Sequence, residues 1–230
     1  MIKQVKILAI VAVSIVLTAC GATPQPTVSL LSNTLPNQEQ TIGLAFIPPE
    51  DEATTHIYGA GCLLCYGVAS ALTSSLDKHL ESNVTTDELI AIKDLVKSKY
   101  EQRFAKVIEL NLPKPVDKLP KFKGELGFAE RDFKTLKNQL GVDVLVVFEV
   151  SEHGAFRSFS NYVPNGDPQG YVSGILYAVD LNDNKYIQYQ PIRVTVQPPG
   201  EWDEPDTFPT FTTSYYQAIE DVKKQLSNIM

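Results

Sequence analysis

The chain lacks a surplus of basic residues and a long apolar run. It has 20 Lys and Arg against 27 Asp and Glu, for a formal net charge of −7. Phosphate backbones and anionic lipid surfaces attract clustered basic side chains, so this balance excludes nucleic acid as a partner and argues against a basic membrane-binding patch. The one strongly apolar run, residues 7–19, is shorter than the roughly 20 residues that a membrane-spanning helix needs.

Histidine and cysteine are also scarce, with three of each. The histidines have no spacing that implies a catalytic triad, and the sequence contains neither a G-x-S-x-G elbow nor a phosphate-binding glycine loop. We therefore predict no enzymatic activity, no cofactor and no metal.

The N-terminus has the pattern of an export signal. Lys3 and Lys6 precede the apolar run, which ends in small residues directly before Cys20. Leu17-Thr18-Ala19-Cys20 resembles the lipobox of bacterial lipoproteins, in which the cysteine becomes the acylated N-terminus. The resemblance implies a signal peptide over 1–19 and a lipid anchor on Cys20, and Gly21 implies the outer membrane, facing the Gram-negative periplasm.

Two further segments follow from composition. Residues 20–40 are proline-containing and aperiodic, and we predict that they form a flexible tether. Residues 41–230 are the right size for one periplasmic α/β domain. Within it we predict strands over 41–47, 107–112 and 142–150, a hairpin of 171–181 and 185–196, and helices over 64–80, 85–104, 128–140 and 215–229.

This order of elements carries a second resemblance. The strand VDVLVVFEV after a helix and glycine, the hairpin GYVSGILYAVDLNDNKYIQYQPI and the terminal helix SYYQAIEDVKKQL resemble periplasmic lipoproteins of the TolB N-terminal-domain-like group, which includes LpoB, PelC and CsgG. The resemblance implies an α/β (α+β) fold with a single mixed sheet covered by helices. It also implies a non-enzymatic accessory role, in which the protein binds envelope partners or assembles with itself.

The stretch GAGCLLCYGVAS places Cys62 and Cys65 three residues apart. In an oxidising compartment a structural disulfide is the favoured interpretation. A thiol-disulfide catalyst and a metal site completed by His56 are alternatives, although the 13-residue separation from Pro49, at the end of the first strand, to Cys62 argues against the catalyst.

The same stretch also lies in an uncharged segment. From Tyr58 to Leu72 no side chain is charged, which suits a subunit contact or a membrane-facing lip. Burial in the protein's own core is the favoured expectation.

Aromatic residues concentrate late in the chain. Tyrosines often anchor protein interfaces, so we predict partner binding through Tyr171, Tyr177, Tyr186, Tyr189 and Trp202. A carbohydrate-binding module that uses Trp202 and its acidic neighbours is a third alternative. The sequence thus favours a membrane-anchored accessory or assembly component whose partners are other envelope proteins or a second copy of itself.

Overall fold

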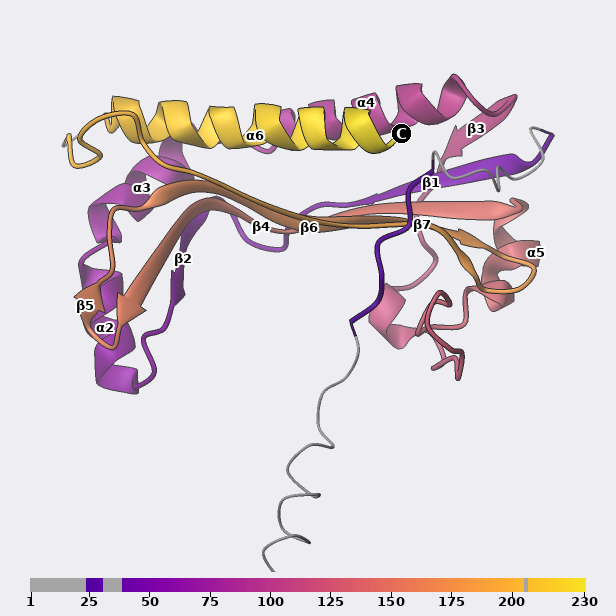
Figure 1. The fold of residues 1–230 in the computed structure, drawn as a ribbon, viewed down its shortest axis with the longest axis horizontal. Helices are drawn as coiled ribbons and strands as arrows, with labels where there is room; N and C mark the ends of the chain where they lie inside the picture. The colour runs from indigo at the N-terminus through magenta and orange to yellow at the C-terminus, as the bar shows by residue number, and fades with distance from the viewer. Residues whose placement is uncertain (1–23, 31–38, 205–206) are drawn as a thin grey trace, which may run out of the picture.

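The computed structural model describes residues 24–30, 39–204 and 207–230, and the predicted signal peptide and Cys20 lie outside them. These residues form one mixed sheet of seven strands with five helices, the predicted α/β class (Figure 1). The last element is the predicted C-terminal helix, α6 (Pro209–Ile229).

The central strand is β4 (Val144–Ser160). Two strands lie parallel to it on one side, with β1 (Thr41–Ile47) along its first half and β2 (Thr54–Tyr58) along its second. The short strand β3 (Lys106–Glu109) pairs parallel with β1 and forms that edge of the sheet.

The other side of β4 is antiparallel. It pairs with β6 (Gln169–Asp180), which pairs with the edge strand β7 (Tyr186–Val196). The connection contains Asn184 at φ 70°, so the predicted hairpin is confirmed. The two-residue strand β5 (Val163–Pro164) folds back onto the end of β4.

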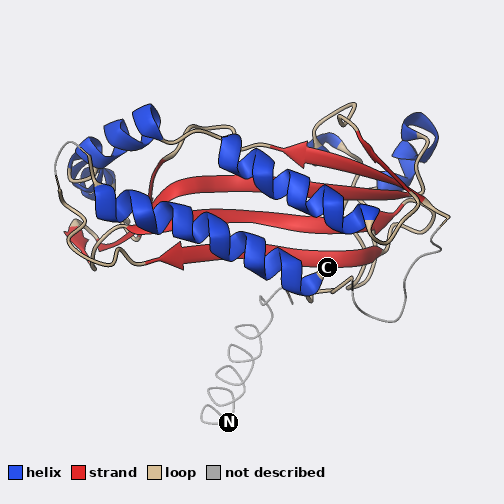
Figure 2. Cartoon of the chain, turned by 90° about the horizontal axis from the view of Figure 1, so that it is seen from above, coloured by secondary structure: helices blue, strands red, loops and turns tan. Residues whose placement is uncertain are grey.

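Three helices cover one face of the sheet, which we call the helix face. They are α3 (Ser74–Asn83), α4 (Asp87–Glu101) and α6, and the last two lie lengthwise over the strands (Figures 1 and 2). Their inward side chains share one buried cluster with alternate residues of β4, for example Leu89, Tyr215 and Val146.

The opposite, open face is covered only at one end. There the 3-10 turns Val116–Lys118 and Phe133–Leu136 and the short helix α5 (Lys137–Leu140) lie below the sheet. Leu145 and Val147 of β4 pack into this smaller cluster while Val144 and Val146 point to the helix face. The first half of β4 is therefore buried on both sides, as its continuous apolar run predicts.

Several predicted boundaries are wrong. The helix predicted over 64–80 is two helices, α2 (Leu63–Ala71) and α3, separated at Leu72 and Thr73. The helix predicted over 128–140 is reduced to the last 3-10 turn and α5. The strand β2 was not predicted, because its sequence TTHIY is short and lacks a regular apolar alternation.

The helix face contains one buried histidine. His153 of β4 is 1% exposed, and its Nδ1 lies 3.0 Å from the hydroxyl oxygen of Tyr215 in α6. Burial lowers the pKa of His153 to about 4, and the nearby His56 acts in the same direction. The fold therefore requires this imidazole to be neutral.

The buried histidine makes stability depend on pH. The unfolded chain binds a proton at His153 near pH 6.5, whereas the folded chain binds it only near pH 4. Because the unfolded state holds more protons in between, the free energy of unfolding should fall as pH drops from about 6.5 to about 4, by up to ~3 kcal/mol. Urea unfolding across this range measures the slope. His153→Asn should flatten it, and an unchanged slope would contradict this assignment.

Candidate functional site

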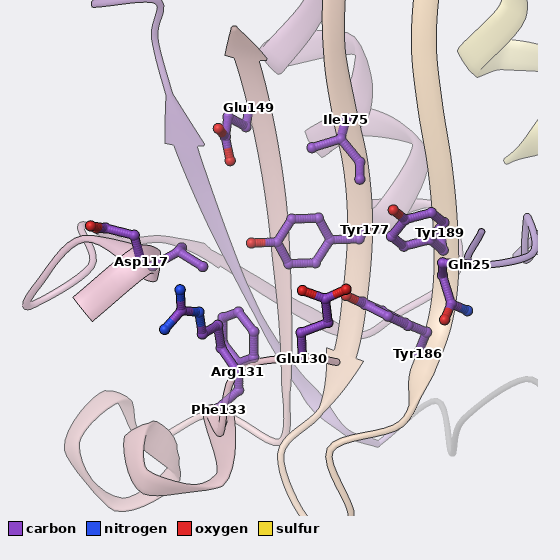
Figure 3. A pocket seen from close by; sticks show the side chains of 11 residues that line it. Gln25, Asp117, Glu130, Arg131, Phe133, Glu149, Ile175, Tyr177, Tyr186 and Tyr189 are labelled. Carbon is purple, nitrogen blue, oxygen red and sulfur yellow. The ribbon is translucent and has the colours of Figure 1, made fainter. Parts of the chain in front are cut away.

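Three of the five aromatic residues predicted to bind a partner lie together on the open face. Tyr177 from β6 and Tyr186 and Tyr189 from β7 line one pocket of about 390 Å³ (Figure 3). The rings of Tyr177 and Tyr186 are 5.9 Å apart between centroids, and those of Tyr186 and Tyr189 are 4.8 Å apart. The phenols thus form a continuous aromatic wall.

A β-bulge brings the last two tyrosines to the same face. Residues an odd number apart on a regular strand point to opposite faces. In β7, however, Tyr186 lies opposite Val179 and Tyr189 lies opposite Tyr177, with the pairing shifted by one residue between them. Since Tyr177 and Val179 share a face, Tyr186 and Tyr189 share it too. The sequence pattern alone does not reveal this shift.

The remaining walls come from segments far apart in the chain. Glu149 of β4 and Ile175 of β6 form the floor beside Tyr177, and the segment around the second 3-10 turn supplies Glu130 and Arg131. The other lining residues are Gln25, Val116, Asp117 and Phe133. None of these lining residues was predicted, because nothing local in the sequence brings these segments together.

The pocket is acidic. It holds the three carboxyl groups of Asp117, Glu130 and Glu149 and one cation, Arg131. Arg131 already donates from Nη1 to the carbonyl oxygen of Leu119 at 3.1 Å. Burial raises the pKa of Glu149 above its ordinary value, so a cationic group that enters the pocket would favour its charged form.

The phenols remain neutral under all physiological conditions. Burial is the largest cause that raises the pKa of Tyr177, Tyr186 and Tyr189. Each can therefore offer a hydroxyl group that donates and accepts hydrogen bonds, and an aromatic face that attracts a cation.

A second depression continues this pocket. Val116, Asp117 and Glu149 belong to both, and the depression extends to Ile47 at the end of β1 and to the proline-rich segment 112–115. Its volume is about 570 Å³. Together the two hollows make one groove across the open face, which we call the open-face groove.

The segment before the domain forms part of the groove's rim. Val28 pairs with Tyr189 through two backbone hydrogen bonds of 2.9 Å, and Gln25 Oε1 accepts a hydrogen bond from the backbone N–H of Gly127. Leu30 is buried in the helix-face cluster. Of the tether predicted over 20–40, residues 24–30 thus lie against the body of the protein.

Tyr171 lies elsewhere, at 0% exposure. Its hydroxyl group and that of Tyr58 both donate to Oε2 of Glu152, at 2.8 and 2.6 Å, and His56 Nδ1 lies 3.7 Å from Oε1. Burial raises the pKa of Glu152, but the two phenol bonds and the nearby cations outweigh it and leave that pKa below its ordinary value. Tyr171 therefore anchors the half-buried carboxylate of Glu152 and has no free hydroxyl group to offer a partner.

Trp202 is also apart from the groove. Its ring stacks on Phe208, and the guanidinium carbon of Arg157 lies 4.7 Å from the ring centroid. These contacts hold the acidic loop onto the body of the protein, which is a structural role. A sugar-binding platform would need a free ring face, so the carbohydrate alternative gains no support from this arrangement.

The two cysteines lie at the start of α2. Cys62 and Cys65 are joined in a disulfide, and Cys62 is the N-cap residue of the helix. Strand β2 ends at Tyr58, only four residues before Cys62. The long segment expected between a strand and Cys62 therefore does not exist, and it does not count against a redox role. Within the described ranges, no group of three or more His, Cys, Asp or Glu side chains is placed to hold a metal ion.

Comparison with known proteins gives distant similarity only. No family model and no curated protein matches. Among solved structures, the chain is similar to a PelC dodecamer from Paraburkholderia phytofirmans (7% identity, 89% of this chain and 94% of that one, TM-score 0.34). It is also similar to a DUF330 protein from Xanthomonas campestris (8%, 90% and 91%, 0.38) and to lipoprotein GNA1162 from Neisseria meningitidis (12%, 82% and 99%, 0.30). At these TM-scores the likeness carries no argument about function.

Removal of the Glu152 carboxylate tests whether its cluster is structural. Glu152→Ala leaves the hydroxyl groups of Tyr58 and Tyr171 without their common acceptor, which should cost about 1–3 kcal/mol of unfolding free energy. Glu81→Ala, on the exposed side of α3, is the matched control and should change stability by less than about 0.5 kcal/mol. Equal effects of the two substitutions in urea unfolding would contradict the assignment.

Proposed function

We propose that this chain is a lipid-anchored lipoprotein of the bacterial envelope and a non-enzymatic accessory or assembly component that acts through protein contacts. The observation that carries the proposal is the open-face groove, where three phenols surround an acidic floor. The lipobox at Cys20 supports the anchor, and Gly21 supports the outer membrane with the domain in the periplasm.

The groove favours a partner with a basic side chain on an extended segment. Glu130 and Glu149 offer carboxylates, and the rings of Tyr186 and Tyr189 offer faces for a Lys or Arg side chain. The groove continues across the strands to Ile47, which gives an extended peptide room on both sides of that anchor. The ligand we propose is a segment of another envelope protein, and a second copy of this chain is the alternative partner.

Charge reversal in the groove tests this proposal. Glu130 is exposed, so Glu130→Lys should leave the fold intact while it repels a basic side chain. Crosslinking in intact cells followed by mass spectrometry should recover a partner with the unchanged chain, and at least tenfold less of it with Glu130→Lys. The same charge change on the helix face, Glu81→Lys, is the control. Equal recovery of the partner with both variants would show that the groove is not part of the binding surface.

One observation favours a second candidate function, thiol-disulfide exchange. Cys62 is exposed at a helix N-terminus, and its Sγ accepts the backbone N–H of Cys65 at 3.0 Å. Helix N-termini lower thiol pKa values, which is what redox cysteines need. Redox cysteines also sit in electropositive surroundings, whereas no charged side chain lies between Tyr58 and Leu72.

Substitution of both cysteines separates the two functions. Cys62→Ser with Cys65→Ser should leave partner recovery unchanged, because the disulfide closes a very short loop and acts only on the start of α2. Thiol alkylation of cells before and after reduction should label the pair only after reduction. Free thiols in vivo, or lost partner recovery in the double variant, would favour the redox function.

A further inference from the structure

Most of the large apolar side chains that the described residues expose to solvent lie at one end of the molecule. Leu63 is 91% exposed and Leu64 is 78% exposed, and they are followed along α2 by other exposed apolar residues. The turn after β4 adds Tyr162, and the first residue of β5 adds Val163. We call this set the apolar tip: Leu63, Leu64, Tyr66, Val68, Leu72, Tyr162 and Val163.

Helix α2 turns its small side chains towards the protein and its large apolar side chains towards solvent, which is the reverse of a helix that packs on a core. Its buried residues are Cys65 and Ala69, one turn apart, while its leucines and its tyrosine point outward. The expectation that this segment is buried in the protein's own core is therefore wrong. An amphipathic helix stabilises a fold by burying its large apolar side chains, and α2 does not bury them in this domain. Its exposed apolar side chains therefore mark a contact surface for something outside the domain.

The two parts of the tip are held together. The backbone N–H of Asn161 donates to the carbonyl oxygen of Gly59 at 3.3 Å, and Gly59 adopts φ 80°. A Cβ atom on Gly59 would lie 2.2 Å from the carbonyl oxygen of Phe159, so only glycine permits this contact. Figure 1 shows α2 and β5 side by side at one end of the sheet.

The tip lies on the same side of the sheet as segment 24–30. In Figure 1, α2 projects below the strands, away from α4 and α6, and segment 24–30 descends on that side as well. Gln25 of this segment lines the pocket of the open face. Only residues 21–23 separate Pro24 from Cys20, so the chain between them spans at most about 14 Å.

We infer that the apolar tip docks into the interface of the lipid bilayer, as a second membrane contact beside the lipid on Cys20. This inference rests on the proposed function, because a lipidated Cys20 would hold the open-face side close to the bilayer. Exposed leucines that enter the acyl boundary, with a tyrosine at headgroup level, are the side chains that such interfaces accept. The tip has no charged residue from Tyr58 to Leu72, so it suits neutral phospholipid and has no need of anionic lipid.

Tryptophan reporters in the full lipidated chain test the docking. In a Trp202→Phe background, Leu64→Trp places the reporter on the tip, and Ile90→Trp places it at an exposed position of α4 on the helix face. The protein is reconstituted into phosphatidylcholine vesicles with and without brominated acyl chains. Leu64→Trp should emit at shorter wavelength and lose about half or more of its fluorescence to bromine, while Ile90→Trp should be nearly unquenched.

The outcomes separate the tip from the anchor. Equal, weak quenching at both positions would overturn the inference, as would crosslinks from the tip to a protein or to a second copy without quenching. The mass of the N-terminal peptide reports the lipid on Cys20 independently. If no lipid is present on Cys20, the proposed anchor is wrong. The same two reporters, in protein added to preformed vesicles, then still test the docking of the apolar tip. Quenching confined to Leu64→Trp would support the docking, and no quenching at Leu64→Trp would overturn it.

Discussion

The structure depends on the length of β4, which pairs with two strands on one side and with one long strand on the other. Its first half is buried on both faces and pairs with β1, and its second half pairs with β2 and carries Glu152 and His153. A pairing irregularity between Val150 and Glu152 separates the halves. Both ends of the molecule are therefore positioned by one strand, and neither the groove nor the tip could shift without it.

The two faces of the sheet differ in what covers them. The covered helix face contributes most of the buried core, and the open face has the surface that is available for binding. The helix face is covered by three helices over a large buried cluster, and a buried contact between His153 and Tyr215 joins α6 to β4. The open face is covered only near α5, which leaves the strands beyond it to line the groove. Tyr171, whose hydroxyl group is used inside the fold, and Tyr177, which lines the groove, lie on the same strand, β6.

Local sequence patterns predicted the elements whose signals are strong. The apolar run of β4, the Asn-rich hairpin turn and the spacing of α6 each indicated the correct element, and Gly141, directly after the helix predicted over 128–140, ends α5 at φ 66°. The same patterns could not predict whether an apolar stripe on a helix packs on the core or faces solvent. Leu64, Val68, Leu72, Leu76 and Leu80 have one spacing, yet only the last two are buried, because a break at Thr73 turns the second helix onto the core. The grouping of Tyr186 with Tyr189 depends on a bulge, which is a property of the paired strands and has no signal in either strand alone.

The edge strand β7 limits how copies of this protein can associate. Val28 already occupies the backbone groups of Tyr189, and Pro191, in the middle of the strand, has no N–H to donate. The opposite edge consists of two short strands, β3 with four residues and β2 with five. Neither edge is therefore a good template for a strand of another molecule, which protects this protein at high local concentration from growing into continuous intermolecular sheets.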